Sequence, residues 1–215
     1  MKKTLLLPTL LLGLASTSFA QMDMRSSPVG AVQTKMPGMD HSKTPMSSSS
    51  TAGPSMNMSG DMGMSDLGKL SGKAFDRAFL SMMIPHHQAA IDMSKAVLPL
   101  SKDATVQKWA KAISADQQKE IGQMNSLLKV YGGSDSKIAG MISSGMKGMG
   151  AKVKASKTPD RTFVGDMVGH HASAIEMASL ALQKSSNTSV LKLARDIVTA
   201  QAGEMYDFQT WLMKR

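Results

Sequence analysis

Residues 76–93 read DRAFLSMMIPHHQAAIDM, and residues 160–177 read DRTFVGDMVGHHASAIEM. The two stretches align without a gap, and the alignment continues to about Lys129 in the first copy and Met213 in the second, with about a third of the positions identical. Self-similarity on this scale indicates two equivalent supersecondary units in one chain.

Each unit has the pattern of two helices. In the first copy these helices span roughly residues 73–99 and 104–130, because apolar residues recur at helical spacing. Cap-forming residues separate the helices at 101–103 and 185–187, and Thr158-Pro159 begins the third helix. The sequence has no alternating run of β-branched residues that would predict a strand. Two hairpins that bury their apolar stripes against each other predict an all-α fold, a four-helix bundle made from a tandem repeat of helix hairpins.

The domain organisation follows from the segments around this repeat. Residues 1–20 combine two lysines, a short apolar run and Ser18-Phe19-Ala20, which is typical of a secretory signal peptide. Residues 21–70, rich in Met, Ser, Gly and Pro, predict a disordered tail. Residues 71–215 form the duplicated helical bundle: repeat one 75–130, a connector 131–158 with a short helix expected near 138–146, and repeat two 159–214. No integral membrane segment is expected, since the apolar runs are shorter than the roughly 20 residues a membrane helix needs.

The composition limits the chemistry. The chain of 215 residues has no cysteine, 21 methionines and a formal charge of +9. Any metal site must therefore use His, Met, Asp or Glu. The lysines are scattered and aromatic residues make up only 4%, so we expect a solvated basic surface and no nucleic-acid partner.

Each repeat places Met and His side chains on one buried helix face. At about 100° per residue, the two histidines of the first motif fall on either side of Met83, on the side that carries the apolar residues. Asp92 points the opposite way, as does Glu176 in the second motif, so neither is expected to bind metal. The candidate metal ligands are Met83, His86, His87 and Met93 in the first copy and Met167, His170, His171 and Met177 in the second.

The second helix of each repeat supplies a carboxylate to the same buried side. Glu120 shares its face with Gln117 and Met124, and Glu204 with Gln201 and Phe208. A buried carboxylate needs a partner, and the histidines of the facing helix are the candidates. We therefore expect Glu120 and Glu204 to orient the imidazoles from behind or to act as additional ligands.

The donor types favour copper. Di-iron bundles use Glu-x-x-His, whereas here Met stands three residues before the first His of both motifs. Met and His together are soft to borderline donors, which suits copper as Cu(I), Cu(II) or both; zinc is the alternative through His and Glu. Pro85 and Gly169 precede the two His pairs and predict a helix irregularity there.

Residues 75–93, FDRAFLSMMIPHHQAAIDM, resemble the family called domain of unknown function 305, and the pattern of Ile113, Gln117, Glu120-Ile121 and Met124 is similar as well. The resemblance covers about residues 72–214. It implies an exported, ferritin-like helical bundle with copper bound through Met and His. The second motif departs from the family pattern at Gly165-Asp166 and Gly169-His170.

The sequence thus predicts an exported copper-binding protein, periplasmic or secreted, that sequesters or buffers copper. It contains no arrangement typical of an enzyme, and the absence of Glu-x-x-His disfavours a metal-dependent oxidase. The alternative is a metal-free interaction module of the cell envelope, in which the His–Glu pairs are structural. The sequence indicates no particular protein partner.

Overall fold

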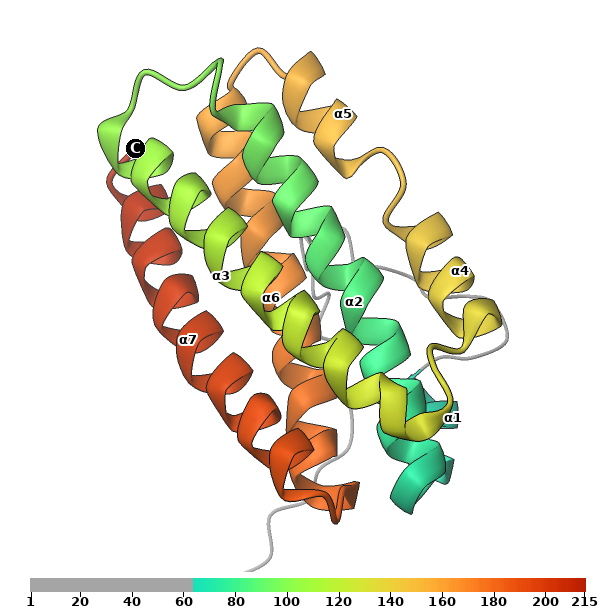
Figure 1. Ribbon diagram of the computed structural model, residues 1–215. Coiled ribbons are helices and arrows are strands. Elements are labelled where there is room, and N and C mark those ends of the chain that lie inside the picture. The colour runs from blue at the N-terminus through green and yellow to red at the C-terminus, as the bar shows by residue number, and fades with distance from the viewer. Residues whose placement is uncertain (1–63) are drawn as a thin grey trace, which may run out of the picture. The chain divides into compact units, whose positions relative to one another are not determined.

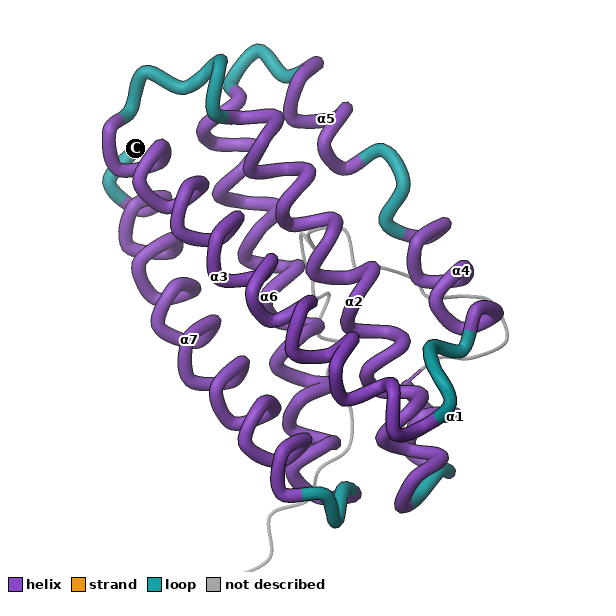
Figure 2. Tube along the Cα trace, in the orientation of Figure 1, coloured by secondary structure: helices purple, strands orange, loops and turns teal. Residues whose placement is uncertain are grey.

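The computed structural model describes residues 64–215, and within that range every regular element is helical (Figure 2). The predicted signal peptide and the Met-rich tail as far as residue 63 lie outside the described residues. The elements are α1 (Met64–Lys69), α2 (Gly72–Val97), α3 (Ala104–Leu128), the 3-10 helix η1 (Lys129–Tyr131), α4 (Ser136–Gly145), α5 (Met149–Ala155), α6 (Pro159–Lys184) and α7 (Thr188–Met213).

Four long helices form the bundle. α2 packs along α3 and α6 packs along α7, so each repeat is one helix hairpin (Figure 1). The hairpins meet mainly through α2 and α6, which run in opposite directions, while α3 and α7 touch only sparsely. The shorter helices α4 and α5 lie against α2. The expected all-α, ferritin-like four-helix bundle is confirmed.

The helix starts follow the predicted caps. Asp103 accepts hydrogen bonds from the backbone N–H groups of residues 105 and 106, at 2.8 and 3.2 Å. Asn187 does the same for residues 189 and 190, at 2.9 and 3.3 Å. Pro159 occupies the first turn of α6, where its missing N–H has no helical acceptor to lose. These local signals set where α3, α6 and α7 begin.

The helix irregularity expected before the His pairs does not interrupt either helix. α2 continues through Pro85 and α6 through Gly169 without interruption. Each residue weakens only one position of a 26-residue helix that is buried along one side. Tertiary packing therefore outweighs the local preference of a single proline or glycine.

Two further helices differ from expectation. The short helix expected near 138–146 is present as α4, but α5 was not predicted, because its sequence is short and begins after two glycines. Val153, which is fully buried, holds α5 on the bundle. At the other end, α1 lies inside the stretch expected to be tail, and Leu67, 1% exposed, packs into the core.

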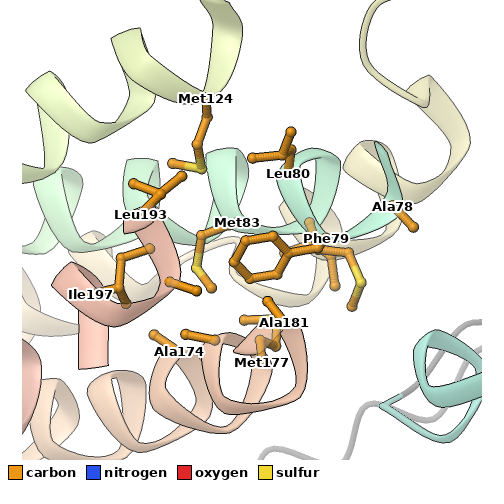
Figure 3. Packing of buried hydrophobic residues seen from close by; sticks show 14 of the residues in the cluster. Ala78, Phe79, Leu80, Met83, Met124, Ala174, Met177, Ala181, Leu193 and Ile197 are labelled. Carbon is orange, nitrogen blue, oxygen red and sulfur yellow. The ribbon is translucent and has the colours of Figure 1, made fainter. Parts of the chain in front are cut away.

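The core consists of two apolar clusters at different levels of the bundle. The first apolar cluster includes Phe79, Met83, Met124, Met177 and Ile197 (Figure 3). The second apolar cluster includes Met93, Ile113, Phe163, Met167 and Phe208. On α3, α6 and α7, the stretch of residues between the two clusters carries polar side chains.

Helix α5 approaches α2 closely at Gly150. A Cβ atom at this position would lie 3.0 Å from the backbone oxygen of Asp92. Since that oxygen belongs to the backbone of α2, it cannot move aside as a flexible side chain would. The absence of a side chain at residue 150 therefore sets the distance between the two helices.

We predict that Gly150→Ala destabilises the protein by about 1–3 kcal/mol, because overpacking forces α5 away from α2. The matched control is Gly140→Ala, in the exposed middle of α4, where an added Cβ meets nothing within 4 Å. That change should stabilise the protein by about 0.5–1 kcal/mol, because alanine favours helix over glycine. Urea denaturation followed by circular dichroism measures both. Equal effects of the two substitutions would show that α5 does not depend on this contact.

Candidate metal centre

The two Met-x-x-His-His motifs converge in the middle of the bundle. α2 and α6 run in opposite directions (Figure 1). The rings of His86 and His170 lie against each other with their centroids 3.8 Å apart and their planes tilted by 39°. His87 and His171 flank them, at 6.4 and 6.1 Å from their neighbours in sequence. All four side chains are at most 1% exposed. The two motifs thus form one layer of imidazoles instead of two separate sites.

The outer imidazoles are each held by a carboxylate. The Nε2 of His87 lies 2.7 Å from an oxygen of Glu120, and the Nε2 of His171 lies 2.7 Å from an oxygen of Glu204. An ionised carboxylate only accepts hydrogen bonds, so Nε2 carries the proton in both rings. The pairing expected from the helix faces is therefore confirmed.

The inner imidazoles have the same tautomer for a different reason. His170 Nε2 lies 2.9 Å from the backbone carbonyl of His86, which can only accept. The hydroxyl of Ser173 already donates its one proton to the carbonyl of His170, at 2.9 Å. The contact of 2.7 Å between His86 Nε2 and Ser173 Oγ must then be a bond in which the histidine donates. All four rings carry their proton on Nε2.

Ser173 is the member of this network that the sequence analysis missed. It aligns with Ala89 in the first repeat, which has no hydroxyl. His86 therefore donates a hydrogen bond to a serine on the facing helix, whereas His170 donates to a backbone carbonyl. The alignment contained this signal, but only the docking of α2 on α6 shows that position 173 of one repeat serves a histidine of the other.

Four nitrogen lone pairs remain without a partner. The Nδ1 atoms of His86, His87, His170 and His171 are fully buried, and none has a hydrogen-bond partner within the described range. Burial without a partner is costly for a polar atom. A neutral imidazole whose other nitrogen is fixed by a hydrogen bond is the usual form of a metal-binding histidine.

The four methionines of the two motifs belong to the apolar clusters of the core. Met83 and Met177 belong to the first apolar cluster (Figure 3), and Met93 and Met167 to the second. All four are at most 1% exposed. With Gln117, Glu120, Gln201 and Glu204, the four histidines form what we call the polar layer, which lies between the two apolar clusters. Asp92 and Glu176 are exposed, as expected, and take no part in it.

The surroundings keep the inner imidazoles neutral. Burial lowers the pKa of His170 to about 3, with a smaller contribution from His171 and His87. Burial also lowers the pKa of His86 well below its usual value, and the neighbouring imidazoles add to this effect. The Nδ1 lone pairs of both rings consequently stay unprotonated through the neutral and mildly acidic range.

The donor set has a definite chemical character. Between residues 64 and 215, no three His, Cys, Asp or Glu side chains are grouped so that they could hold a metal ion together. The two motifs offer thioether sulfur in addition to imidazole nitrogen. Imidazole and thioether are the donors that copper accepts and that harder ions avoid, so the residues present fit copper.

Comparison with known proteins places the chain in a family. The profile described as Domain of unknown function (DUF305) matches residues 17–155 and 160–215. CopM in its Cu(II)-bound form superimposes with a TM-score of 0.56 and 27% identity, over 65% of this chain and 97% of CopM. A DUF305 fragment from Deinococcus radiodurans gives a TM-score of 0.57 and 26% identity, over 65% of this chain and 96% of the fragment. CopM has also been solved in Cu(I)-bound and Ag-bound forms.

A shorter relative matches one part of the chain. The uncharacterized protein L153 of Acanthamoeba polyphaga mimivirus is 45% identical over 53 residues, which are 25% of this chain and 35% of L153. The match thus spans about a third of the viral protein.

None of the helices in residues 64–215 combines the length and the apolar character needed to cross a bilayer.

We predict that metal-free protein loses stability as the pH falls below about 6.5. The unfolded chain binds protons at its histidines from there downward, while His170 in the folded chain stays neutral until about pH 3. His170 alone should contribute a loss of about 1.4 kcal/mol per pH unit between pH 6 and 5. Urea denaturation in the presence of a chelator measures the slope.

The variant His170→Gln should flatten this pH dependence by about that amount. His41→Gln, in the N-terminal stretch, is the matched control and should leave the slope unchanged. A slope that His170→Gln does not alter would contradict the assignment of a depressed pKa to this ring.

Proposed function

The chain belongs to the DUF305 family, and on that premise we propose that it is an exported copper-binding protein that sequesters or buffers copper without acting on it as an enzyme. The observation that carries this proposal is the set of four buried Nδ1 atoms without hydrogen-bond partners in the described residues. The four methionines of the same motifs are buried in the adjoining apolar clusters. The copper-bound and silver-bound structures of CopM, to which this chain is similar, also support the proposal.

The proposed ligands are the imidazole Nδ1 atoms and the thioethers of the two motifs. They are Met83, His86, His87, Met93, Met167, His170, His171 and Met177. Glu120 and Glu204 would not contact the metal. Each would hold the proton of its histidine on Nε2 and so leave Nδ1 free to bind the metal. Thioether sulfur favours Cu(I), and imidazole accepts both oxidation states.

Zinc is the weaker candidate. Zinc sites in proteins are built from Cys, His, Asp and Glu, and residues 64–215 hold no group of three such side chains in position for a metal. A site completed by methionine discriminates in favour of copper, because zinc gains little from thioether ligands.

The N-terminal segments extend the proposal. The predicted signal peptide, residues 1–20, would place the protein in the periplasm or outside the cell. The predicted tail contains Met36, Met39, Met46 and further methionines in a polar setting, as in Met56-Asn57-Met58 and Met62-Gly63-Met64. Such methionines offer soft donors for weak capture of Cu(I), which would add to the binding by the bundle.

A metal-free interaction module is the second candidate, and one observation favours it. The pairs His87–Glu120 and His171–Glu204 are complete hydrogen-bonded pairs without any metal. In that case the polar layer would serve only to fix the register of the four helices. The unpartnered Nδ1 atoms argue against this reading, since a purely structural layer gains nothing from leaving them without donors.

We predict that Met83→Leu together with Met167→Leu weakens Cu(I) binding at least tenfold, because it removes soft donors while conserving volume. His86→Ala with His87→Ala, or His170→Ala with His171→Ala, should each abolish stoichiometric binding by the bundle. Because both His pairs lie in one layer, loss of either pair should affect all the copper bound there. Competition titration of Cu(I), with parallel titrations of Cu(II) and Zn(II), measures these effects.

The matched control is Met82→Leu, which changes a similarly buried methionine directly before Met83 in α2 and should leave the affinity unchanged. The titrations should be repeated on protein that lacks residues 21–63, which keeps Leu67 and α1. If binding disappears with the tail while the His-pair variants of the full chain bind normally, the bundle is the metal-free module and the copper proposal for the polar layer is wrong.

A further inference from the structure

A groove of about 250 Å³ opens between α3 and α7, the two long helices that touch only sparsely. Its walls include four members of the polar layer: Gln117 and Glu120 from α3, and Gln201 and Glu204 from α7. The groove is thus a hollow on the surface whose lining includes the two glutamates that pair with His87 and His171.

The two glutamines are polar groups without partners. Gln117 is 3% exposed and Gln201 is 2% exposed, and for both side chains neither the amide nitrogen nor the amide oxygen has a hydrogen-bond partner in the part of the chain described. They occupy equivalent positions of the two repeats. A buried amide without partners lowers stability, whereas leucine would fill either position without this cost. The polar side chains at these two positions are therefore better explained by an ion that binds or passes between them.

The glutamates connect the groove to the imidazoles. The side chains of Glu120 and Glu204 are 17% and 27% exposed, while their partners His87 and His171 are completely buried. Each carboxylate therefore reaches water on one side and a ring Nε2 on the other. The larger hollow of about 710 Å³ beside Pro85 and Gln88 has no member of the polar layer in its lining, so it offers no comparable approach.

The charge of the groove suits a cation. Asp116, Glu120, Asp196 and Glu204 contribute four carboxylates, and Lys119 and Lys192 contribute two ammonium groups, which leaves a formal charge of −2. Asp196 is already paired, because Lys192 Nζ lies 2.7 Å from its carboxylate and Arg195, which is outside the groove lining, lies 2.6 Å from it. The local negative charge therefore comes from Asp116, Glu120 and Glu204. The groove lining is negative although the whole chain has a formal charge of +9, and negative charge in a hollow raises the local concentration of cations.

We propose that this groove is the access route by which copper ions reach the polar layer, with the amide oxygens of Gln117 and Gln201 as a transient resting point. The inference rests on the proposed function and adds the path to it. The completely buried imidazoles require such a path, because an ion in water cannot reach their Nδ1 atoms across the closed α2–α6 contact. Movement of the Glu120 or Glu204 side chain away from its histidine would open the last step.

The test is the rate of copper association with the full mature chain, measured by stopped-flow quenching of tryptophan fluorescence with copper(II) sulfate in a weakly coordinating buffer. Trp109 reports on the layer, because it lies edge-on to Phe208 at 5.0 Å, and Phe208 lies 5.5 Å from His171. Ala200→Phe places a ring over the groove. Ala202→Phe, exposed on the same helix but outside the groove lining, is the matched control.

We expect Ala200→Phe to slow association and dissociation by the same factor of ten or more, so that the equilibrium affinity and the amount bound stay unchanged. Ala202→Phe should have the rates of the unmodified chain. Equal rates for all three proteins, or equal slowing by both substitutions, would overturn the access route while leaving copper binding intact. Absence of any copper binding by the unmodified chain would overturn the proposed function and the route together.

A charge substitution gives an independent measurement that does not depend on steric blocking. Asp116→Lys at the groove should lower the association rate at low ionic strength severalfold and weaken its dependence on salt. Asp207→Lys, exposed on α7 outside the groove lining, changes the net charge equally and should have little effect. Identical effects of the two substitutions would show that only the total charge matters, which would contradict a local route.

Discussion

The antiparallel contact between α2 and α6 determines the chemistry of the whole bundle. It places the rings of His86 and His170 3.8 Å apart in a layer from which water is excluded. Two cationic rings could not share that space, so both stay neutral, and burial holds the pKa of His170 near 3. The hydrogen bonds at Nε2 then fix one tautomer, and the unpartnered Nδ1 atoms follow from it. Without this contact, the two motifs would be separate histidine pairs on two hairpins and would not share one buried layer.

A polar layer inside a helical bundle has a cost in stability that the rest of the core offsets. Apolar clusters lie on both sides of it and supply the burial that holds the four helices together. Glu120 and Glu204 satisfy the outer rings, while Gln117 and Gln201 are left without partners beside the groove. The uneven satisfaction of these groups is typical of a binding site and unusual for a layer that only specifies register. The proposed copper storage in the layer and the proposed access through the groove would account for both sets of unpartnered atoms.

Most of the fold could be predicted because its signals are local. Repetition of the Met-x-x-His-His motif, the caps at Asp103 and Asn187 and the helical spacing of apolar residues all act within one hairpin. The helix faces also predicted the pairing of His87 with Glu120. How one hairpin docks on the other is not encoded in such signals, so the contact of His86 with His170 and the role of Ser173 could not be predicted. Helix α5 and the unbroken passage of α2 through Pro85 likewise depend on tertiary packing, which outweighs weak local preferences.

The most direct test of the account is the protonation state of the ring nitrogens, observed by NMR on protein with ¹⁵N-labelled histidine before and after addition of Cu(I), or of Ag(I) as its redox-inert substitute. In the metal-free protein at neutral pH, all four core histidines should show a protonated Nε2 and a bare Nδ1. Metal should shift the Nδ1 resonances while Nε2 keeps its proton. Spectra in which metal binds and the four rings do not respond, or in which Nε2 loses its proton to the metal, would contradict the central claim that this layer is the copper site.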